Sequence, residues 1–136
     1  MIATIPRDYS FDWKLKHFQP AADLVAVARA HPRDVTPRKA VNLKLYALGP
    51  SVCSQRVRLV LTEKELSFSE RFMVDIGPEG PEPAGLQPWY LAINPRGLVP
   101  AIVENGRPLF DSATIMRYVN NVFEGPALAP EDSGAF

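Results

Sequence analysis

Apolar and polar side chains alternate regularly from about residue 42 onward. In residues 42–48, three apolar side chains alternate with Lys44 and Tyr46, a period of two that is typical of a strand. A Gly-Pro pair and a short polar cluster follow, and residues 55–66 then carry their apolar side chains at helical spacing. The pattern therefore predicts a strand followed by a helix.

The rest of the chain continues this alternation of elements. Residues 67–75 predict a second strand, and the Gly/Pro-dense residues 77–88 predict a long exposed loop. Residues 99–112 contain two short apolar runs about an Asn-Gly pair, which is the strongest short-range signal for a β-hairpin. Residues 112–123 return their apolar side chains to one face of a helix. The predicted order is strand, helix, strand, loop, hairpin, helix.

The first 41 residues precede this periodic part and form a predicted arm. Within the arm, residues 20–31 predict a short helix, because Pro20 suits a first helical turn and an apolar stripe follows it. Residues 31–42 contain two further prolines, each of which restrains the preceding residue away from helix. We expect this segment to be a solvated, Pro-rich connector, and a binding role for its basic residues is less favoured.

Composition narrows the function classes. The chain has 136 residues, with 15 basic and 15 acidic side chains and no net charge, so no overall field attracts it to nucleic acid or to an anionic membrane. No apolar run reaches the length of roughly 18–20 residues that a membrane span needs, and no signal peptide is expected. One cysteine allows no internal disulfide, and no Cys/His cluster predicts a metal site. A cytoplasmic location is expected.

A hydroxyl and the single thiol lie at the joint between the predicted first strand and first helix. Ser51 is a candidate N-cap whose oxygen accepts from the N–H of Cys53 or Ser54. A hydroxyl there can instead donate to a bound thiolate, which the positive end of the helix dipole also stabilises. Cys53 has two interpretations: a reactive thiol in the first helical turn, or a small buried hydrophobic residue.

Three motifs carry a resemblance to a known family. They are "PSVCSQRVR" at residues 50–58, "INPRGLVPAI" at residues 93–102 and "DSATIMRYV" at residues 111–119. In this order and spacing, residues 43 to about 132 resemble the N-terminal, glutathione-binding domain of soluble glutathione transferases, and the motifs are most similar to the serine-containing zeta and tau classes. The resemblance implies an α/β fold of the thioredoxin-like type, a βαβ-ββα order with a mixed four-stranded sheet, here with an N-terminal extension.

The resemblance also implies roles for individual residues. Ser51 would stabilise the glutathione thiolate, and Cys53 could act as a second nucleophile, as in the related glutathione-dependent reductive dehalogenases. A cis Pro100 would turn the backbone of Val99 outward to pair with the cysteinyl part of glutathione. Asp111 and Ser112 would belong to the glutathione site as well, with Ser112 and the free N–H groups of a helix start binding the γ-glutamyl carboxylate.

The residues themselves also support simpler interpretations. Without the resemblance, Pro100 is best explained as an ordinary turn proline, and either Asp111 or Ser112 as a helix cap. Asp111 is one methylene shorter than the usual glutamate of the family. Gly97 and Leu98 lack the polar side chain that zeta relatives often place there for the glycyl end of the peptide.

Three segments and two functions follow. Residues 1–41 are the arm, residues 42–125 the glutathione-binding domain, and residues 126–136 the start of an interdomain linker, with the family's helical C-terminal domain absent from this chain. The first function is a transferase that activates glutathione, its co-substrate, for attack on a small electrophile. The alternative is a non-catalytic glutathione-binding or assembly module. The resemblance also allows a homodimer, and neither nucleic acid nor a membrane is an expected partner.

Overall fold

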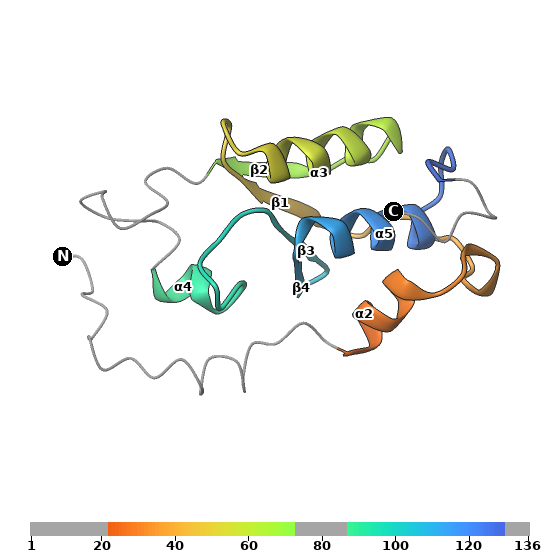
Figure 1. Cartoon of the computed structure of the whole chain (residues 1–136), viewed down its shortest axis with the longest axis horizontal. Helices are drawn as coiled ribbons and strands as arrows, with labels where there is room; N and C mark the ends of the chain where they lie inside the picture. Colours follow the sequence, from red (N-terminus) through yellow and green to blue (C-terminus); the bar gives the residue numbers. More distant parts are fainter. Residues whose placement is uncertain (1–21, 73–86, 130–136) are drawn as a thin grey trace.

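The structure is a computed structural model that describes residues 22–72 and 87–129. Its centre is a four-stranded mixed sheet in the order β2-β1-β3-β4. The strands are β1 (Leu43–Ala47), β2 (Ser69–Phe72), β3 (Ala101–Glu104) and β4 (Arg107–Phe110). The helices are α2 (Ala22–Arg29), α3 (Val52–Glu63), α4 (Pro88–Leu91) and α5 (Ser112–Val122), with a 3-10 turn at Pro32–Asp34. Figure 1 shows α5 between α3 and α2.

The topology is the mixed βαβ-ββα arrangement that the sequence predicts. Strand β1 is parallel to β2, and α3 forms the crossover between them. Strand β1 is antiparallel to β3, and β3 forms a hairpin with β4. The hairpin turn holds Asn105 at φ 50° and Gly106 at φ 80°, two positive values that an Asn-Gly pair adopts readily. The hairpin prediction is confirmed.

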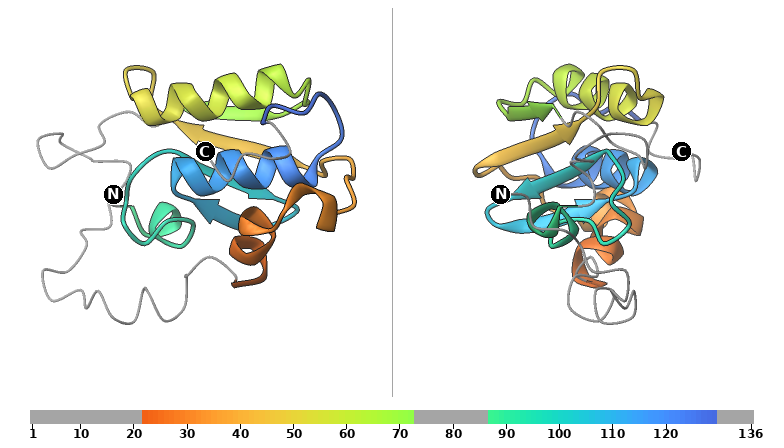
Figure 2. Two further views of the ribbon diagram at one scale, coloured as in Figure 1. Left: turned by 45° about the vertical axis from the view of Figure 1, so that its right-hand side comes forward. Right: turned by 90° about the vertical axis from the view of Figure 1, so that its left-hand side faces the viewer.

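The main core lies between the sheet and the helices α3 and α5, which lie across the same side of the strands (Figure 2). Leu45 of β1, Val57 and Leu61 of α3, and Ile115 and Val119 of α5 are all fully buried there. The apolar side chains that recur at helical spacing in the sequence of α3 and α5 thus form the faces of these helices that pack in the core. This core orients the N-terminal ends of both helices.

A second, smaller core covers part of the opposite face of the sheet. It consists of Tyr46, Tyr90, Ala101 and Phe110, and Tyr90 comes from α4, a short helix that the sequence pattern does not predict. The ring centroids of Tyr46 and Tyr90 are 5.7 Å apart in an edge-on arrangement. Tyr46 alternates with the apolar residues of β1 but is itself buried, because α4 packs on its face.

The helix predicted in the arm is confirmed as α2, and it packs on α5. Leu24 and Ala28 of α2 belong to the main core. Asn121 of α5 is buried and donates from Nδ2 to the carbonyls of Val27 (3.1 Å), Ala28 (3.3 Å) and Ala30 (3.0 Å). Carbonyls at a helix C-terminus lack intrahelical donors. The Asn121 side chain, which belongs to α5, supplies the missing hydrogen-bond donor at the end of α2.

The prediction of a purely solvated connector at residues 31–42 is wrong for Arg38. The backbone of Arg38 forms a bridge with Phe123, and its guanidinium binds Glu104 and Tyr118. The charge pattern of the segment gives no hint of this, because the partner lies 66 residues away in sequence. Predictions for residues 1–21, for most of the 77–88 loop and for residues 130–136 lie outside the described residues.

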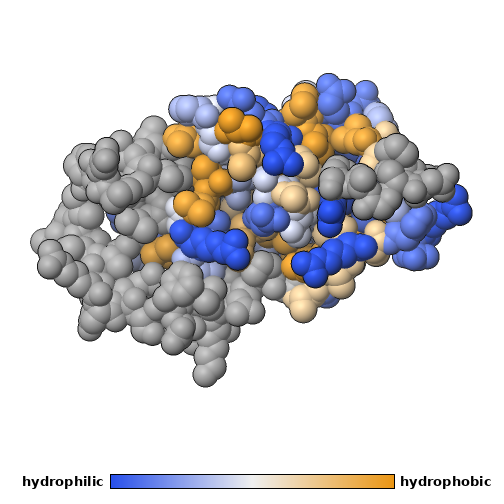
Figure 3. All heavy atoms as spheres, viewed as in Figure 1, coloured by the Kyte–Doolittle hydropathy of each residue, from blue (hydrophilic) through white to orange (hydrophobic). Residues whose placement is uncertain are grey.

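The face that presents α3 and α5 carries hydrophobic residues among hydrophilic ones (Figure 3). Val52 and Leu59 of α3 are the most exposed of its large apolar side chains, at 69% and 60%. They are seven residues apart and therefore on one side of the helix, away from the side that Val57 and Leu61 bury in the core.

Candidate functional site

The strand register brings three of the predicted site segments to one end of the sheet. Ala101, the first residue of β3, pairs with Tyr46 near the end of β1 and with Phe110 at the end of β4. The loop that leaves β1, the segment that enters β3 and the turn that leaves β4 therefore meet at the same end of the sheet. These are the segments that carry Ser51, Pro100 and the start of α5.

Ser51 is the N-cap of α3, as predicted. It has φ −72° and ψ 120°, and its Oγ accepts from the Ser54 N–H at 3.1 Å. A hydroxyl has one proton to donate in addition to its acceptor lone pairs. The cap uses a lone pair and leaves this proton free, so capping and donation to a bound thiolate are compatible.

Ser54 holds the loop in front of this cap, a role that the sequence analysis missed. It is fully buried, and its Oγ accepts from the Leu48 N–H at 3.2 Å. Gln55 Nε2 donates to the Gly49 carbonyl at 2.9 Å. The two bonds tie the chain between β1 and α3 to the first turn of the helix. The only sequence signal was a second serine at the third helical position.

Cys53 is exposed in the first turn of α3. Of the two interpretations of this residue, the small buried hydrophobic one is wrong. The thiol is accessible in the helical turn that Ser51 caps. Its chemical role stays a prediction.

The Val99–Pro100 peptide bond is cis, as the resemblance implies. Within residues 22–72 and 87–129, the N–H and C=O of Val99 make no hydrogen bond. The preceding carbonyl, that of Leu98, accepts from Tyr90 Oη at 2.5 Å and from Asn94 Nδ2 at 2.8 Å. Burial raises the pKa of the Tyr90 hydroxyl, which keeps it a donor. Tyr90 and Asn94 thus fix the chain just before the Val99 edge, and neither was predicted.

Asp111, not Ser112, is the N-cap of α5. Asp111 Oδ2 accepts from the Thr114 N–H at 3.1 Å and from Thr114 Oγ1 at 2.8 Å. Its φ of 77° and ψ of 114° are uncommon for a residue with a side chain. Ser112 is the first residue of the helix and is 8% exposed. Its use as a carboxylate ligand stays a prediction.

The described residues contain neither a metal-binding cluster nor a membrane-spanning helix. No group of three or more His, Cys, Asp or Glu side chains among them could hold a metal ion. No helix in the described part of the chain is long and apolar enough to cross a bilayer.

Comparison with known proteins identifies the family. Residues 50–122 match the family model of the glutathione S-transferase N-terminal domain. The chain belongs to the glutathione S-transferase family. The predicted resemblance is therefore confirmed, and the matched residues contain all three motifs on which it rested.

Individual relatives of the chain support the same conclusion. Maleylacetoacetate isomerase of Pseudomonas aeruginosa is 38% identical over 91 residues, which cover 66% of this chain and 42% of that protein. The β-etherase LigF of Sphingobium, which has a crystal structure, is 34% identical in sequence to this chain. Its structure matches this one with a TM-score of 0.57, over 68% of this chain and 37% of that one. Rice GST1 in complex with glutathione is 28% identical, with a TM-score of 0.56 over 68% of this chain and 38% of that one.

The chain spans about two-fifths of the length of these relatives. The family match begins at residue 50. Helix α2 and the segment up to the end of β1 therefore lie before the matched region, although both contribute to the same core.

Proposed function

We propose that this chain binds glutathione at the end of the sheet where the α3 cap, the Val99 edge and the start of α5 meet. The observation that carries the proposal is the register, since Ala101 pairs with both Tyr46 and Phe110. One short peptide can reach all three segments only if they lie at the same end of the sheet. Rice GST1, a structural relative, is complexed with glutathione, which supports the choice of ligand.

Each part of the peptide has a matching group in the proposed site. The Val99 N–H and C=O would pair with the backbone of the cysteinyl residue, as one strand pairs with another. The γ-glutamyl carboxylate would lie at the N-terminus of α5 with the Ser112 hydroxyl, because the free N–H groups of a helix start favour an anion. The glutathione sulfur would then lie at the start of α3, near Ser51.

The proposed chemistry is activation of the glutathione thiol. The Ser51 hydroxyl donates to the sulfur, and the dipole of α3, equivalent to about half a positive charge at this end, favours the thiolate. The thiol proton passes to solvent, and the thiolate attacks an electrophilic carbon. A carbon–sulfur bond forms and the leaving group departs with its electron pair. A small electrophile, a homodimer and a cytoplasmic location are the family-level parts of this proposal.

Cys53 adds a second nucleophile to the proposal. If the first product is a carbon–glutathione thioether that can be reduced, the Cys53 thiolate can attack its sulfur. The carbon–sulfur bond then breaks, the carbon takes a proton, and a disulfide forms between Cys53 and glutathione. The exposure of Cys53 supports this role, because the attacking sulfur must reach a bound molecule.

Calorimetric titration with glutathione tests the binding. We expect Ser112→Ala to weaken binding by about 1.5–3 kcal/mol, the range for a hydrogen bond to a charged group. Ser67→Ala is the matched control, since Ser67 is exposed and precedes β2 at the opposite end of the sheet. A flat titration of folded protein at millimolar glutathione would contradict the proposal.

A second assay on the same protein distinguishes the transferase from the alternative function, a non-catalytic binding or assembly module. Glutathione binding together with conjugation of a simple aryl halide supports the transferase. Binding without any conjugation above the rate in buffer supports the binding module. The two functions share the glutathione site and differ only in turnover.

A further inference from the structure

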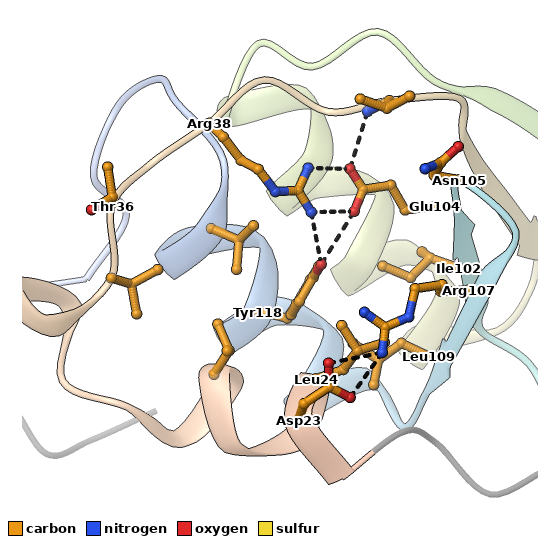
Figure 4. A pocket seen from close by; sticks show the side chains of 14 residues that line it. Asp23, Leu24, Thr36, Arg38, Ile102, Glu104, Asn105, Arg107, Leu109 and Tyr118 are labelled. Atoms are coloured by element: carbon orange, nitrogen blue, oxygen red, sulfur yellow. Dashed lines mark hydrogen bonds and ion pairs between the residues drawn. The ribbon is translucent and has the colours of Figure 1, made fainter.

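A cavity lies at the other end of the sheet, between the arm and the β3–β4 hairpin (Figure 4). Its volume is about 400 Å³, within the range of roughly 300–1,000 Å³ that is usual for small-molecule pockets. Glu104 in its wall pairs with Leu43 at the start of β1, whereas Ser51 follows the end of that strand. The cavity is therefore remote from the proposed glutathione site.

The floor of the cavity is aliphatic. Leu24 and Val27 come from α2, Ile102 from β3, Leu109 from β4 and Val122 from α5. All except Val27 are buried, with Leu24 the most exposed of them at 7%, and Val27 is half-buried. The floor thus offers a ligand branched aliphatic side chains, and the aromatic ring that also lines the cavity, that of Tyr118, has its hydroxyl bound to Glu104 and Arg38.

The charged groups of the cavity neutralise one another in two pairs. Arg38 binds Glu104 at 2.6 and 2.7 Å, and Arg107 Nη2 donates to both carboxylate oxygens of Asp23 at 2.8 Å. Two cations and two anions leave no net charge among these lining residues. A charged ligand would find no unpaired counter-ion, and it would lose hydration on entering.

Two donors at the rim remain available to a ligand. Arg107 uses a single nitrogen for Asp23, and its Nε and Nη1 make no hydrogen bond within the described residues. The Asn105 side-chain amide, also at the rim, likewise has no hydrogen-bond partner in that part of the chain. Both residues are exposed, so their donors can bind a hydrogen-bond acceptor without breaking an existing bond.

We propose that this cavity is a binding site for a small, uncharged molecule with an aliphatic body and a carbonyl-type head. The body packs on the floor formed by Leu24, Val27, Ile102, Leu109 and Val122. The head accepts from Arg107 or Asn105 at the rim.

This site is independent of glutathione binding. Leu24, Val27, Val35 and Arg38 lie ahead of residue 50, where the family match begins. The arm therefore contributes one complete wall of the cavity. A ligand there bridges α2 and the hairpin and is expected to stabilise their contact.

Nuclear magnetic resonance of the ¹⁵N-labelled full chain tests the proposal, with heptan-2-one as the probe. We expect saturable shifts of amides in residues 23–41 and 102–109, and no competition with glutathione. Heptanoate, the matched anion, is expected to bind at least about tenfold more weakly, because its carboxylate must be desolvated without a free counter-ion. Equal or tighter binding of heptanoate would overturn the assignment of an uncharged head.

Two variants that fill the cavity make the location testable. Val27→Phe and Val35→Phe each place a ring in it from a different segment, and either is expected to weaken heptan-2-one binding about tenfold or more. Leu59→Phe, at an exposed position on α3, is the control and leaves binding unchanged. If a filling variant does not fold, the other one decides. Unchanged binding in a folded filling variant, or no saturable shift in the parent, overturns the proposal.

Discussion

Glu104 and Arg38 form a two-point ion pair that joins the end of β3 to the segment ahead of β1. Arg38 Nη1 lies 2.6 Å from Glu104 Oε2, and Nη2 lies 2.7 Å from Oε1. The same carboxylate accepts from the Val41 N–H at 3.0 Å and from the Tyr118 hydroxyl at 3.1 Å. Glu104 is only 6% exposed, so these donors replace the water that it loses on folding.

Removal of the guanidinium is expected to destabilise the fold. Arg38→Ala leaves the buried Glu104 carboxylate without its main partner, and we expect a loss of about 1–3 kcal/mol of unfolding free energy, since the Arg38 side chain is partly exposed. Urea unfolding measures it. Arg107→Ala, which removes the exposed ion pair with Asp23, is the control and should change stability much less. Equal losses in the two variants would show that the burial of Glu104 does not matter.

The same carboxylate predicts how stability depends on acid. Burial by itself would raise the pKa of Glu104, but the hydrogen bonds from Arg38, Val41 and Tyr118 outweigh it and hold the pKa below the ordinary 4.5. A carboxylate with a depressed pKa in the folded state contributes stability above its unfolded pKa and loses it as the pH falls through the folded value.

Stability is therefore expected to be level from pH 7 down to about 5 and to fall below the ordinary pKa of Glu104. Glu104→Gln removes the titrating group and should reduce the steepness of that fall, although it lowers stability at neutral pH. Tyr118, whose pKa is raised to about 12 by burial and by the Glu104 charge, stays protonated throughout this range. An equally steep acid fall in Glu104→Gln, measured by urea unfolding at several pH values, would assign it to other carboxylates.

The sequence predicted those parts of the fold that follow from local pattern. The strand and helix periods of β1, α3 and α5, the Asn-Gly hairpin and the Ser51 cap each depend on neighbours within a few residues. The contacts that it missed depend on distant partners. Nothing near Asn121 reveals that it completes the end of α2, and nothing near Arg38 indicates Glu104.

For the candidate site, the sequence predicted the residue types but not their support. Ser51, Val99 and Ser112 were found through motifs that resemble a family. Ser54, Tyr90 and Asn94, which fix the adjoining backbone, lie in segments whose polarity has several explanations. Only the register of β1, β3 and β4 shows that these segments lie at one end of the sheet.

The segment after α5 is held by a buried lysine, and this gives a further prediction. Lys64 is 3% exposed, burial lowers its pKa, and its Nζ donates to the carbonyls of Asn120 at 3.1 Å and Pro126 at 3.0 Å. Gly125, with φ 124°, lies so close that an added Cβ would collide with the Lys64 carbonyl oxygen.

Gly125→Ala is therefore expected to destabilise the fold by more than about 1 kcal/mol, because both its φ and the contact exclude a side chain. Gly49→Ala is the matched control, since nothing lies within 4 Å of its added Cβ, and it should change stability little. Thermal unfolding compares the two. A melting temperature for Gly125→Ala equal to that of the parent would show that the segment after α5 moves away from Lys64 without cost.

The last prediction separates the hydroxyl of Ser51 from the thiol of Cys53. Ser51→Ala removes the N-cap bond to Ser54, so a loss of about 1 kcal/mol in stability is expected. If Ser51 also donates to the sulfur, the pKa of bound glutathione rises and conjugation slows. Cys53→Ser should leave both the pKa and conjugation nearly unchanged and abolish only a reaction that forms a disulfide with glutathione.

Spectroscopic titration of bound glutathione gives its pKa, and the thiolate absorbance can be followed whether or not the chain turns over. The stability loss is measured separately by urea unfolding, so that a weaker cap is not mistaken for lost chemistry. Ser51→Thr is the matched variant, because it retains a hydroxyl that can both cap the helix and donate, and it should restore the lower pKa in part. If Ser51→Ala leaves the pKa of bound glutathione unchanged while Cys53→Ser raises it, then the two roles are reversed and Cys53 is the residue that acts on the glutathione sulfur.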